Sequence, residues 1–278
     1  MFSAITNVSE MQALAAMTLH RSEMNTSMER LATGLRINRA SDDPSGLLVS
    51  ERLKSDEVEL RGRIDAIDRE SSMLGAREGA QGVIGDLVGE LKGLVVQGAN
   101  RGGLGEGEGD ALQTEATSIL QTIQYLANTS TFGGEQIIGG ITPSSLGRIT
   151  RTITNPDGTT EDRTYSLADL GGLLNLKDGD MSIASDVVDA AVSQLASQAG
   201  AMGARAQSMD SEKRQLLSQL ENTSAARSAI TDTDFAAETS SLVRAQVLQQ
   251  ASQFMALFAR QQNAEMVLNL IKPLEVKK

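Results

Sequence analysis

Several residue types are scarce in this chain of 278 residues, and each shortage narrows what the protein can be. The absence of cysteine excludes disulfides, zinc–thiolate sites and a cysteine nucleophile. There is no tryptophan, and two tyrosines and five phenylalanines are less aromatic bulk than a large rounded core uses. Four prolines leave room for long uninterrupted helices. Aliphatic residues, methionine and alanine dominate instead, which suits long helices packed side by side.

Histidine is also scarce, because His20 is the only histidine in the sequence. Without a second histidine or a cysteine, the sequence predicts neither a metal cluster nor a nucleophile–histidine pair. Asp42 and Asp43 could form a carboxylate pair, but they stand directly before Pro44, where helix capping accounts for them. We therefore expect no catalytic residue, no metal, no cofactor and no enzymatic activity.

Long apolar runs are also missing. None approaches the roughly 20 residues that cross a membrane, so we expect no membrane partner. The first residues, Met1 to Thr6, lack the basic region and apolar run of a secretory signal peptide. We expect no such signal.

The net charge of −11 is unevenly distributed. Residues 1–40 hold four arginines and three acidic residues (+1), and residues 235–278 hold five basic and three acidic residues (+2). The residues between therefore carry −14, which is −11 minus 3. An acidic middle disfavours nucleic acid as a partner and keeps the chain soluble. The nearly neutral ends have little charge to resist packing against copies of themselves.

Apolar residues recur at spacings of three and four, which predicts helices packed as coiled coils. Two stripes bear on function, one near each end. The first comprises Leu14, Met17, Met24, Met28, Leu31 and Leu35, and the second Leu248, Ala251, Met255 and Phe258 with Phe254 beside it. Such a stripe is usually internal core. Residues 1–33 and 235–271, however, show more apolar surface than one helix pair hides, and copies of the chain are the simplest further partner.

A stripe of glycines departs from an ordinary helix. Gly75, Gly79, Gly82, Gly89 and Gly93 are spaced by four, three, seven and four residues. Each costs about 0.8–1 kcal/mol relative to alanine inside a helix. Two interpretations stay open: a locally weak helix that its packing tolerates, or a close contact with another helix or subunit.

The middle of the chain changes character. Gly102 to Gly109 predicts a flexible turn between helices, and Thr131 to Gly134 a tight turn. Residues 149–154 and 159–167 predict two strands joined by a turn at 155–158. The fold class is therefore mostly α: a long antiparallel coiled-coil hairpin formed by the amino- and carboxyl-terminal segments, with a small β-containing central region.

Two sequence blocks at opposite ends carry the strongest signal. Leu31 to Asn38 and Ala40 to Leu47 resemble the amino-terminal signature of bacterial flagellin. Asp232 to Thr239 and Ala245 to Ala251 resemble its carboxyl-terminal block. The signature and turn positions are Arg36, Asn38, Asp42, Asp43, Gly46, Asp232, Asp234 and Phe235.

The resemblance implies a filament subunit for swimming motility, whose terminal helices are disordered in the free subunit and fold on assembly. Implied partners are copies of the chain, the flagellar type III export apparatus, a flagellin chaperone, and hook-associated junction and cap proteins. The location would be the extracellular flagellum. Five segments are expected: 1–40, a filament-core helix and spoke; 41–140 and 186–233, the two halves of an outer helical domain; 141–185, a short surface region; and 234–278, a second core helix and tail.

Two alternatives stay open. A hook–filament junction protein shares the helical ends and often a segment like Ser41 to Pro44, although the glutamine block of Ala245 to Ala251 favours flagellin. A secreted adhesin-like protein could use residues 141–185.

Overall fold

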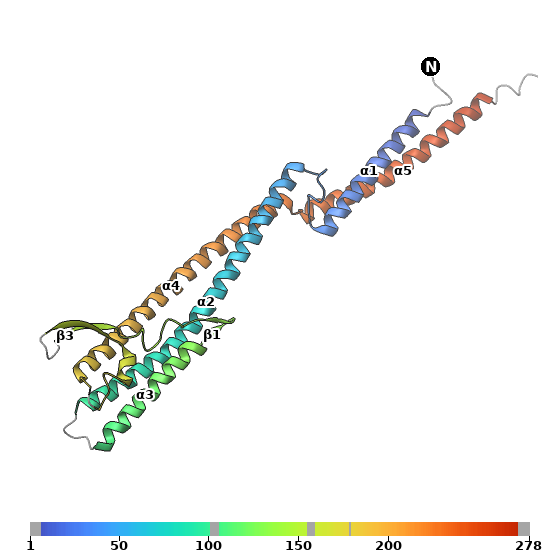
Figure 1. Cartoon of the computed structure of the whole chain (residues 1–278). Helices are drawn as coiled ribbons and strands as arrows, with labels where there is room; N and C mark the ends of the chain where they lie inside the picture. The colour runs from blue at the N-terminus through green and yellow to red at the C-terminus, as the bar shows by residue number, and fades with distance from the viewer. Residues whose placement is uncertain (1–6, 101–105, 155–158, 178, 272–278) are drawn as a thin grey trace, which may run out of the picture. The chain divides into compact units, whose positions relative to one another are not determined.

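The computed structural model describes residues 7–100, 106–154, 159–177 and 179–271, and is mostly helical (Figure 1). Within these ranges the helices are α1 (Val8–Thr33), α2 (Pro44–Ala99), α3 (Glu106–Thr129), α4 (Met181–Thr231) and α5 (Phe235–Ile271), with a 3-10 helix, η2, at Leu167–Gly171. The strands are β1 (Thr131–Phe132), β2 (Glu135–Gln136), β3 (Ile149–Thr154) and β4 (Thr160–Tyr165). The expected mostly-α class with a small β-containing centre is confirmed.

The chain forms two compact units. One combines residues 1–61 with 218–278, and the other comprises residues 62–217. The boundaries fall inside α2 and α4, so both helices contribute to both units. The five-segment division expected from the sequence stays a prediction.

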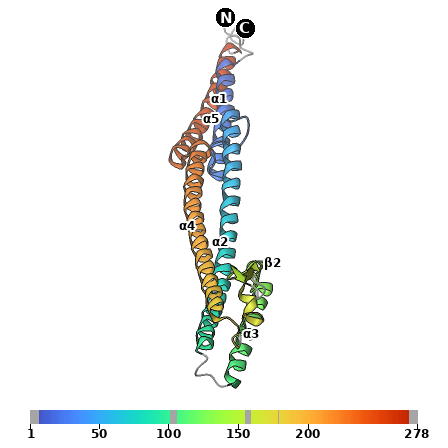
Figure 2. The same cartoon turned by 60° about the vertical axis from the view of Figure 1, so that its left-hand side comes forward.

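The second unit holds the main apolar core, to which α2, α3 and α4 each contribute (Figure 2). Buried side chains recur along α2 at Ile84, Val88, Leu91 and Val95, and along α3 at Leu112, Ala116, Ile119 and Ile123. The segment between α3 and α4 closes this core with Ile138, Leu146, Leu167 and Leu170, all 0% exposed. Leucine, isoleucine and valine thus supply the bulk that aromatic residues provide elsewhere.

One boundary in this unit corrects the sequence-based expectation. The glycine-rich stretch was expected to be a turn through Gly109, yet α3 already begins at Glu106. The Asp110 Oδ1 lies 2.8 Å from the Lys177 Nζ, and Leu112 is buried two residues later. These tertiary contacts outweigh the low helix propensity of glycine. Residues 102–105 of that prediction lie outside the described residues.

The two hairpins are antiparallel. β1 pairs with β2 through Phe132 and Glu135, and β3 pairs with β4 from Ile149 opposite Tyr165 to Thr154 opposite Thr160. The second strand ends at Tyr165 rather than at Leu167, because the next residues form η2 with a capping box at its start. The predicted turn at 155–158 lies outside the described residues.

The glycine stripe of α2 is exposed along its whole length. A methyl group built on any of its five glycines would meet no atom within 4 Å, apart from the backbone of α2 itself. A close contact with another helix is therefore excluded for the described part of the chain. A contact with another subunit stays a prediction.

Candidate functional site

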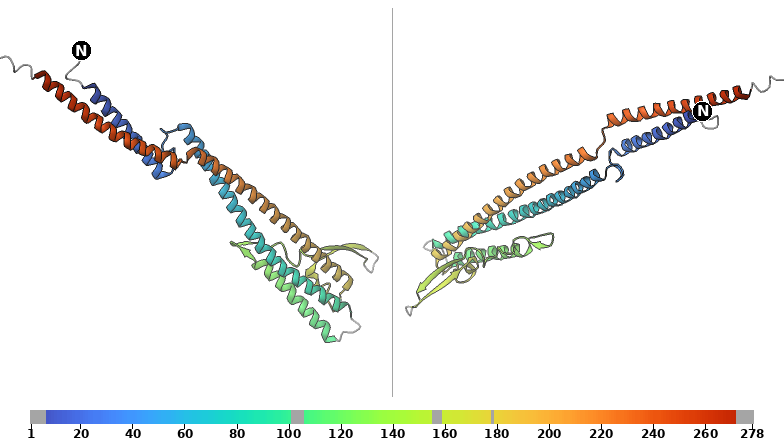
Figure 3. Two further views of the ribbon diagram at one scale, coloured as in Figure 1. Left: turned by 180° about the vertical axis from the view of Figure 1, so that it is seen from behind. Right: turned by 90° about the horizontal axis from the view of Figure 1, so that it is seen from above.

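The terminal helices α1 and α5 lie side by side and antiparallel in the first unit (Figure 3). The side of α5 that faces α1 repeats at alternating spacings of four and three residues. Its members are Glu238, Leu242, Ala245, Gln249, Ser252, Ala256, Ala259 and Asn263, each buried or half-buried. The buried ones, Ala245, Ser252 and Ala256, are all small. We call this contact the α1–α5 seam.

The α1 side of the seam also buries little apolar surface. Its buried residue is Ser27, at 5% exposure. Half-buried positions of the predicted amino-terminal stripe, Met17, Met24 and Leu31, also lie there. Small side chains let two helices approach closely, but they remove little apolar area from water. The seam by itself therefore contributes little hydrophobic stabilisation.

The rest of the amino-terminal stripe points away from the seam. Leu14, Met28 and Leu35 are 36%, 43% and 37% exposed. The predicted stripe is thus split between the seam and the open surface.

The carboxyl-terminal stripe lies entirely off the seam. Leu248, Met255 and Phe258 are 39%, 61% and 55% exposed, and Ala251 is exposed as well. Phe254 beside them is 72% exposed. The α5 helix therefore packs its small and polar residues against α1 and leaves its large apolar side chains uncovered. We call this exposed surface the apolar face of α5.

Polar contacts fix the register of the helix pair. The Asn7 Nδ2 donates to the Ala259 carbonyl at 2.8 Å, while its Oδ1 caps α1 by accepting from the Glu10 N–H at 3.0 Å. Glu10 also pairs with Arg260. At the other end, Arg30 and Glu238 are 3.6 Å apart. His20 belongs to this surface too, with its Nδ1 3.0 Å from the Glu23 carboxylate.

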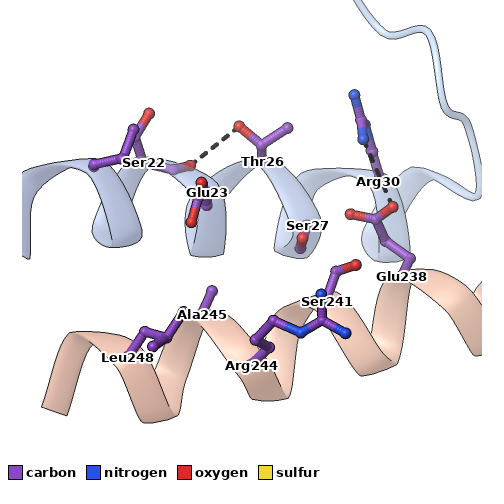
Figure 4. Close-up of a pocket in the computed structure, with 11 residues that line it drawn as sticks. Ser22, Glu23, Thr26, Ser27, Arg30, Glu238, Ser241, Arg244, Ala245 and Leu248 are labelled. Carbon is purple, nitrogen blue, oxygen red and sulfur yellow. Dashed lines mark hydrogen bonds and ion pairs between the residues drawn. The ribbon is translucent and has the colours of Figure 1, made fainter. Parts of the chain in front are cut away.

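A hollow of about 400 Å³ opens beside the seam near Ser27 and Ala245 (Figure 4). The ion pair of Arg30 and Glu238 lies at one end of it, and Leu19 and Leu248 also contribute to its wall. Arg244 lines the hollow from α5. The lining is therefore mixed, because it includes two acidic side chains, Glu23 and Glu238, as well as apolar residues.

The two signature blocks meet in a joint between the helices. The Arg36 N–H donates to the Thr231 carbonyl at 2.7 Å, and the Thr233 N–H donates to the Gly34 carbonyl at 2.9 Å. Leu35 and Asp232 form an antiparallel bridge. The Arg36 guanidinium adds a bond to the Ile230 carbonyl at 2.6 Å. The α1–α2 and α4–α5 connections are therefore bonded to each other, although they lie far apart in the sequence.

Glycine is required at two places in this joint. Gly34 ends α1 at φ 73°, a left-handed conformation, and its N–H donates to the Arg30 carbonyl at 2.8 Å. Gly46, in the first turn of α2, has no room for a side chain. A Cβ there would lie 2.4 Å from the Asp43 Oδ2 and 2.7 Å from the Ile37 Cδ1.

The aspartates of the signature serve as caps and loop closures. The Asp43 Oδ1 accepts from the N–H groups of Ser45 at 3.1 Å and Gly46 at 2.9 Å, which caps α2. The Asp234 Oδ1 caps α5 in the same way, accepting from Ala236 at 2.9 Å and Ala237 at 3.1 Å. These bonds are made locally and involve no chemistry.

Asp42 closes the loop before α2. Its Oδ2 accepts from the N–H groups of Arg39 at 2.9 Å and Asn38 at 3.0 Å, and these two bonds lower the pKa of the carboxyl group. The Asn38 side chain donates to the Leu35 carbonyl at 3.1 Å. On the other connection, Asp232 accepts from the Ser228 hydroxyl at 2.6 Å, and the Phe235 ring lies beside Gly34.

Sequence reasoning missed a buried ion pair next to this joint. The Arg227 Nε lies 2.8 Å from the Glu57 Oε1, and Glu57 is only 5% exposed. The two atoms lack the alignment of a hydrogen bond, so charge rather than directional bonding holds them together. The pair links the first turns of α2 to the last turns of α4, and no spacing rule connects two positions so far apart.

The structure offers no sign of a metal centre or membrane span over the ranges it describes. No three side chains of histidine, aspartate or glutamate gather there as a metal would require. None of the described helices is both long and apolar enough to cross a bilayer.

Long helices, a thin seam between the termini and an uncovered apolar face define a helical structural subunit that associates with further chains. The comparisons with known proteins agree. The family models for the bacterial flagellin N-terminal and C-terminal helical regions match residues 5–142 and 185–271. The chain belongs to the bacterial flagellin family.

Its relatives include full-length matches. The flagellin of Bacillus subtilis (strain 168) is 28% identical over 309 residues, covering 96% of this chain and 98% of that one. The flagellar filament 30.7 kDa core protein of Treponema maltophilum is 29% identical over 285 residues, covering 95% and 98%. Polar flagellin F of Vibrio parahaemolyticus is 35% identical over 139 residues, and the match spans 49% of this chain but only 36% of that longer protein. The crystal structure of Bacillus cereus flagellin is 21% identical, covers 59% of this chain and 94% of that chain, and has a TM-score of 0.40.

Proposed function

We propose that this flagellin is a subunit of the bacterial flagellar filament and that it polymerises through its terminal helices α1 and α5. One observation carries the proposal: α5 turns small residues toward α1 and leaves Phe254, Met255 and Phe258 more than half exposed. An uncovered apolar face on a helix needs a partner. In a homopolymer that partner is another copy of the chain.

The thin seam supports folding of the terminal helices on assembly. Isolated helices are marginal in water, and tertiary packing supplies most of their stability. The side chains that the seam buries are small, namely Ser27, Ala245, Ser252 and Ala256. The cost of ordering α1 and α5 is therefore offset when neighbouring subunits cover their large apolar side chains.

The charge distribution supports an arrangement with the ends inside and the middle outside. Residues 1–40 and 235–278 are nearly neutral, whereas the residues between them carry −14. Packing many copies of the neutral ends together costs little electrostatic repulsion. In this arrangement residues 1–40 and 234–278 form the filament core, residues 41–140 and 186–233 the outer helical domain, and residues 141–185 its surface.

The remaining parts of the proposal follow from family membership. The subunit is structural and has no catalytic role. It acts outside the cell in the flagellum and is exported through the flagellar type III apparatus. Its further partners are a flagellin chaperone and the hook-associated junction and cap proteins.

The test is seeded polymerisation. Purified protein is followed by light scattering and negative-stain microscopy after filament seeds or a precipitating salt are added. A second sample lacks residues 1–33 and 235–278, which removes α1 and α5 but keeps the core of the second unit. We expect long filaments from the full chain alone.

Two other outcomes would redirect the interpretation. Persistent monomers or short caps under all conditions would favour a hook–filament junction protein. Filaments from the truncated chain would refute the role assigned to the terminal helices.

A further inference from the structure

The joint between the α1–α2 and α4–α5 connections has almost no apolar core. Across residues 34–61 and 218–233, the only buried apolar side chain is Ile37. The other buried residues of these two ranges are polar or charged, namely Ser50, Glu57 and Thr231. Since apolar burial is scarce here and is not directional, hydrogen bonds and charges must determine how the two connections are oriented.

The end of α4 is bonded to the loop before α2. Helix ends leave their last carbonyl groups without partners inside the helix. Arg36 occupies two of these acceptors, because its N–H donates to the Thr231 carbonyl at 2.7 Å and its guanidinium donates to the Ile230 carbonyl at 2.6 Å. Both bonds require the last turn of α4 to present those carbonyls in one direction. Contacts with this loop alone would still allow α4 to swivel about it.

The buried ion pair of Glu57 and Arg227 attaches the end of α4 to a second partner. Arg227 lies one helical turn before Thr231, whose hydroxyl donates to the Arg227 carbonyl at 3.0 Å. Glu57 lies in the body of α2, whereas Arg36 lies in the loop before that helix. The last turns of α4 are therefore held both by α2 and by the loop. Two such attachments fix the rotation of these turns about the helix axis.

Stability alone is a poor explanation for this pair. Burying two charges costs free energy that their attraction only partly returns, so a buried ion pair usually adds little stability over well-packed apolar residues. The role best supported for such pairs is to fix one conformation among several. The Arg227 Nε lies 2.8 Å from the Glu57 Oε1 without the alignment of a hydrogen bond. The contact therefore depends on the two charges rather than on the planar shape of the guanidinium.

We propose that the Glu57–Arg227 pair is a positioning device that holds the joint closed in the free subunit, before neighbouring subunits cover α1 and α5. With the pair in place, the last turn of α4 presents its carbonyls to Arg36. The terminal helices then fold from a fixed starting geometry during assembly, and this last step rests on the proposed function. Without the pair, the joint opens locally while the core of the second unit stays intact.

The test is amide hydrogen exchange in the free, full-length subunit. R227Q removes the base and leaves a carboxylate that is only 5% exposed without its partner. The N–H groups of Arg36 and Thr233, which close the joint, should then exchange at least about tenfold faster than in the wild type. E57Q should have a smaller effect, because the side chain of Arg227 is 37% exposed and can turn toward water.

Two further variants separate the charge of Arg227 from its shape and from helix packing in general. R227K keeps the positive charge, and its ammonium group reaches at least as far as the Arg227 Nε, so the joint should exchange as in the wild type. R205Q is the matched control, because Arg205 also extends from α4 to a glutamate of α2, the exposed Glu70, at 2.6 Å. R205Q should leave exchange at the joint unchanged.

An internal reference shows that each variant has folded. The N–H groups of Leu91 and Ile123, whose side chains lie in the core of the second unit, should exchange at the wild-type rate in every variant. A faster rate at the joint alone therefore reports opening of the joint and not unfolding of the chain.

Three results would overturn the inference. The first is equal exchange at Arg36 and Thr233 in the wild type and in R227Q. The second is unprotected exchange of these two N–H groups in the wild-type free subunit, because the joint is then open before assembly. The third is an equal increase at the joint and at Leu91, because the pair then stabilises the whole chain. A wild-type chain that forms no filaments would instead refute the proposed function, since the exchange measurements require no polymerisation.

Discussion

Phe254 offers the sharpest test of the uncovered apolar face. Its side chain is 72% exposed, and complete burial of such a side chain is worth about 1.5–3 kcal/mol. Covering the exposed part in a filament should then contribute about 1–2 kcal/mol per subunit, a factor of about 5–30 in an equilibrium constant. The substitution F254A should raise the critical concentration for polymerisation by that factor.

The measurement is the concentration of free subunit that remains above sedimented filaments. Leu173 provides the control, because it is 62% exposed in the second unit, near the end of η2. The substitution L173A removes a comparably exposed side chain from the acidic middle and should leave the critical concentration unchanged. The reasoning is refuted if F254A assembles like the wild type, or if L173A weakens assembly as strongly as F254A.

Three further predictions concern the joint and the glycine stripe. Replacing Gly46 by alanine should destabilise the monomer by about 1–3 kcal/mol in denaturant unfolding, because the added Cβ collides with the capping Asp43. The control is Gly62→Ala, which adds a Cβ in open space and should stabilise the monomer by nearly 1 kcal/mol. Because the folded pKa of Asp42 is lowered, its contribution to stability is present above the unfolded value near 3.8 and is lost as pH falls through the folded value. The D42N variant should therefore show a flatter stability profile below about pH 4, measured by unfolding at a series of pH values. The double variant G82A/G89A should stabilise α2 by roughly 1 kcal/mol per site. A simultaneous rise in the critical concentration for polymerisation would identify the glycine stripe as a subunit contact. Improved assembly would exclude such a contact.

Local rules explain why much of the fold could be predicted. Helix caps act within three or four residues, so the aspartates before Pro44 were visible as a helix boundary. The spacing of large apolar residues predicted the helices and their mostly-α class for the same reason. The predicted start of α3 was wrong because contacts that Asp110 and Leu112 make with residues distant in the sequence outweigh the low helix propensity of the glycines around them.

The seam was harder to predict because its residues are small. The spacing of large apolar side chains predicted a stripe that includes Leu248, Met255 and Phe258, and the structure leaves these residues exposed. A search for alanine and serine at alternating spacings of three and four would have found Ala245, Ser252 and Ala256. The bonds of the joint could not be found in this way, because no periodicity links Leu35 to Asp232.

The joint has a consequence for timing. Its two strands of backbone are separated by almost 200 residues, and the Asn7–Ala259 bond spans 252 positions. At synthesis rates of about 5–20 residues per second, α1 waits roughly 10–40 s for the segment that will pair with it. During that interval α1 has no α5 to pack against, and the hydrogen bonds of the joint cannot form. The seam and the joint therefore cannot form before the carboxyl-terminal residues have been made.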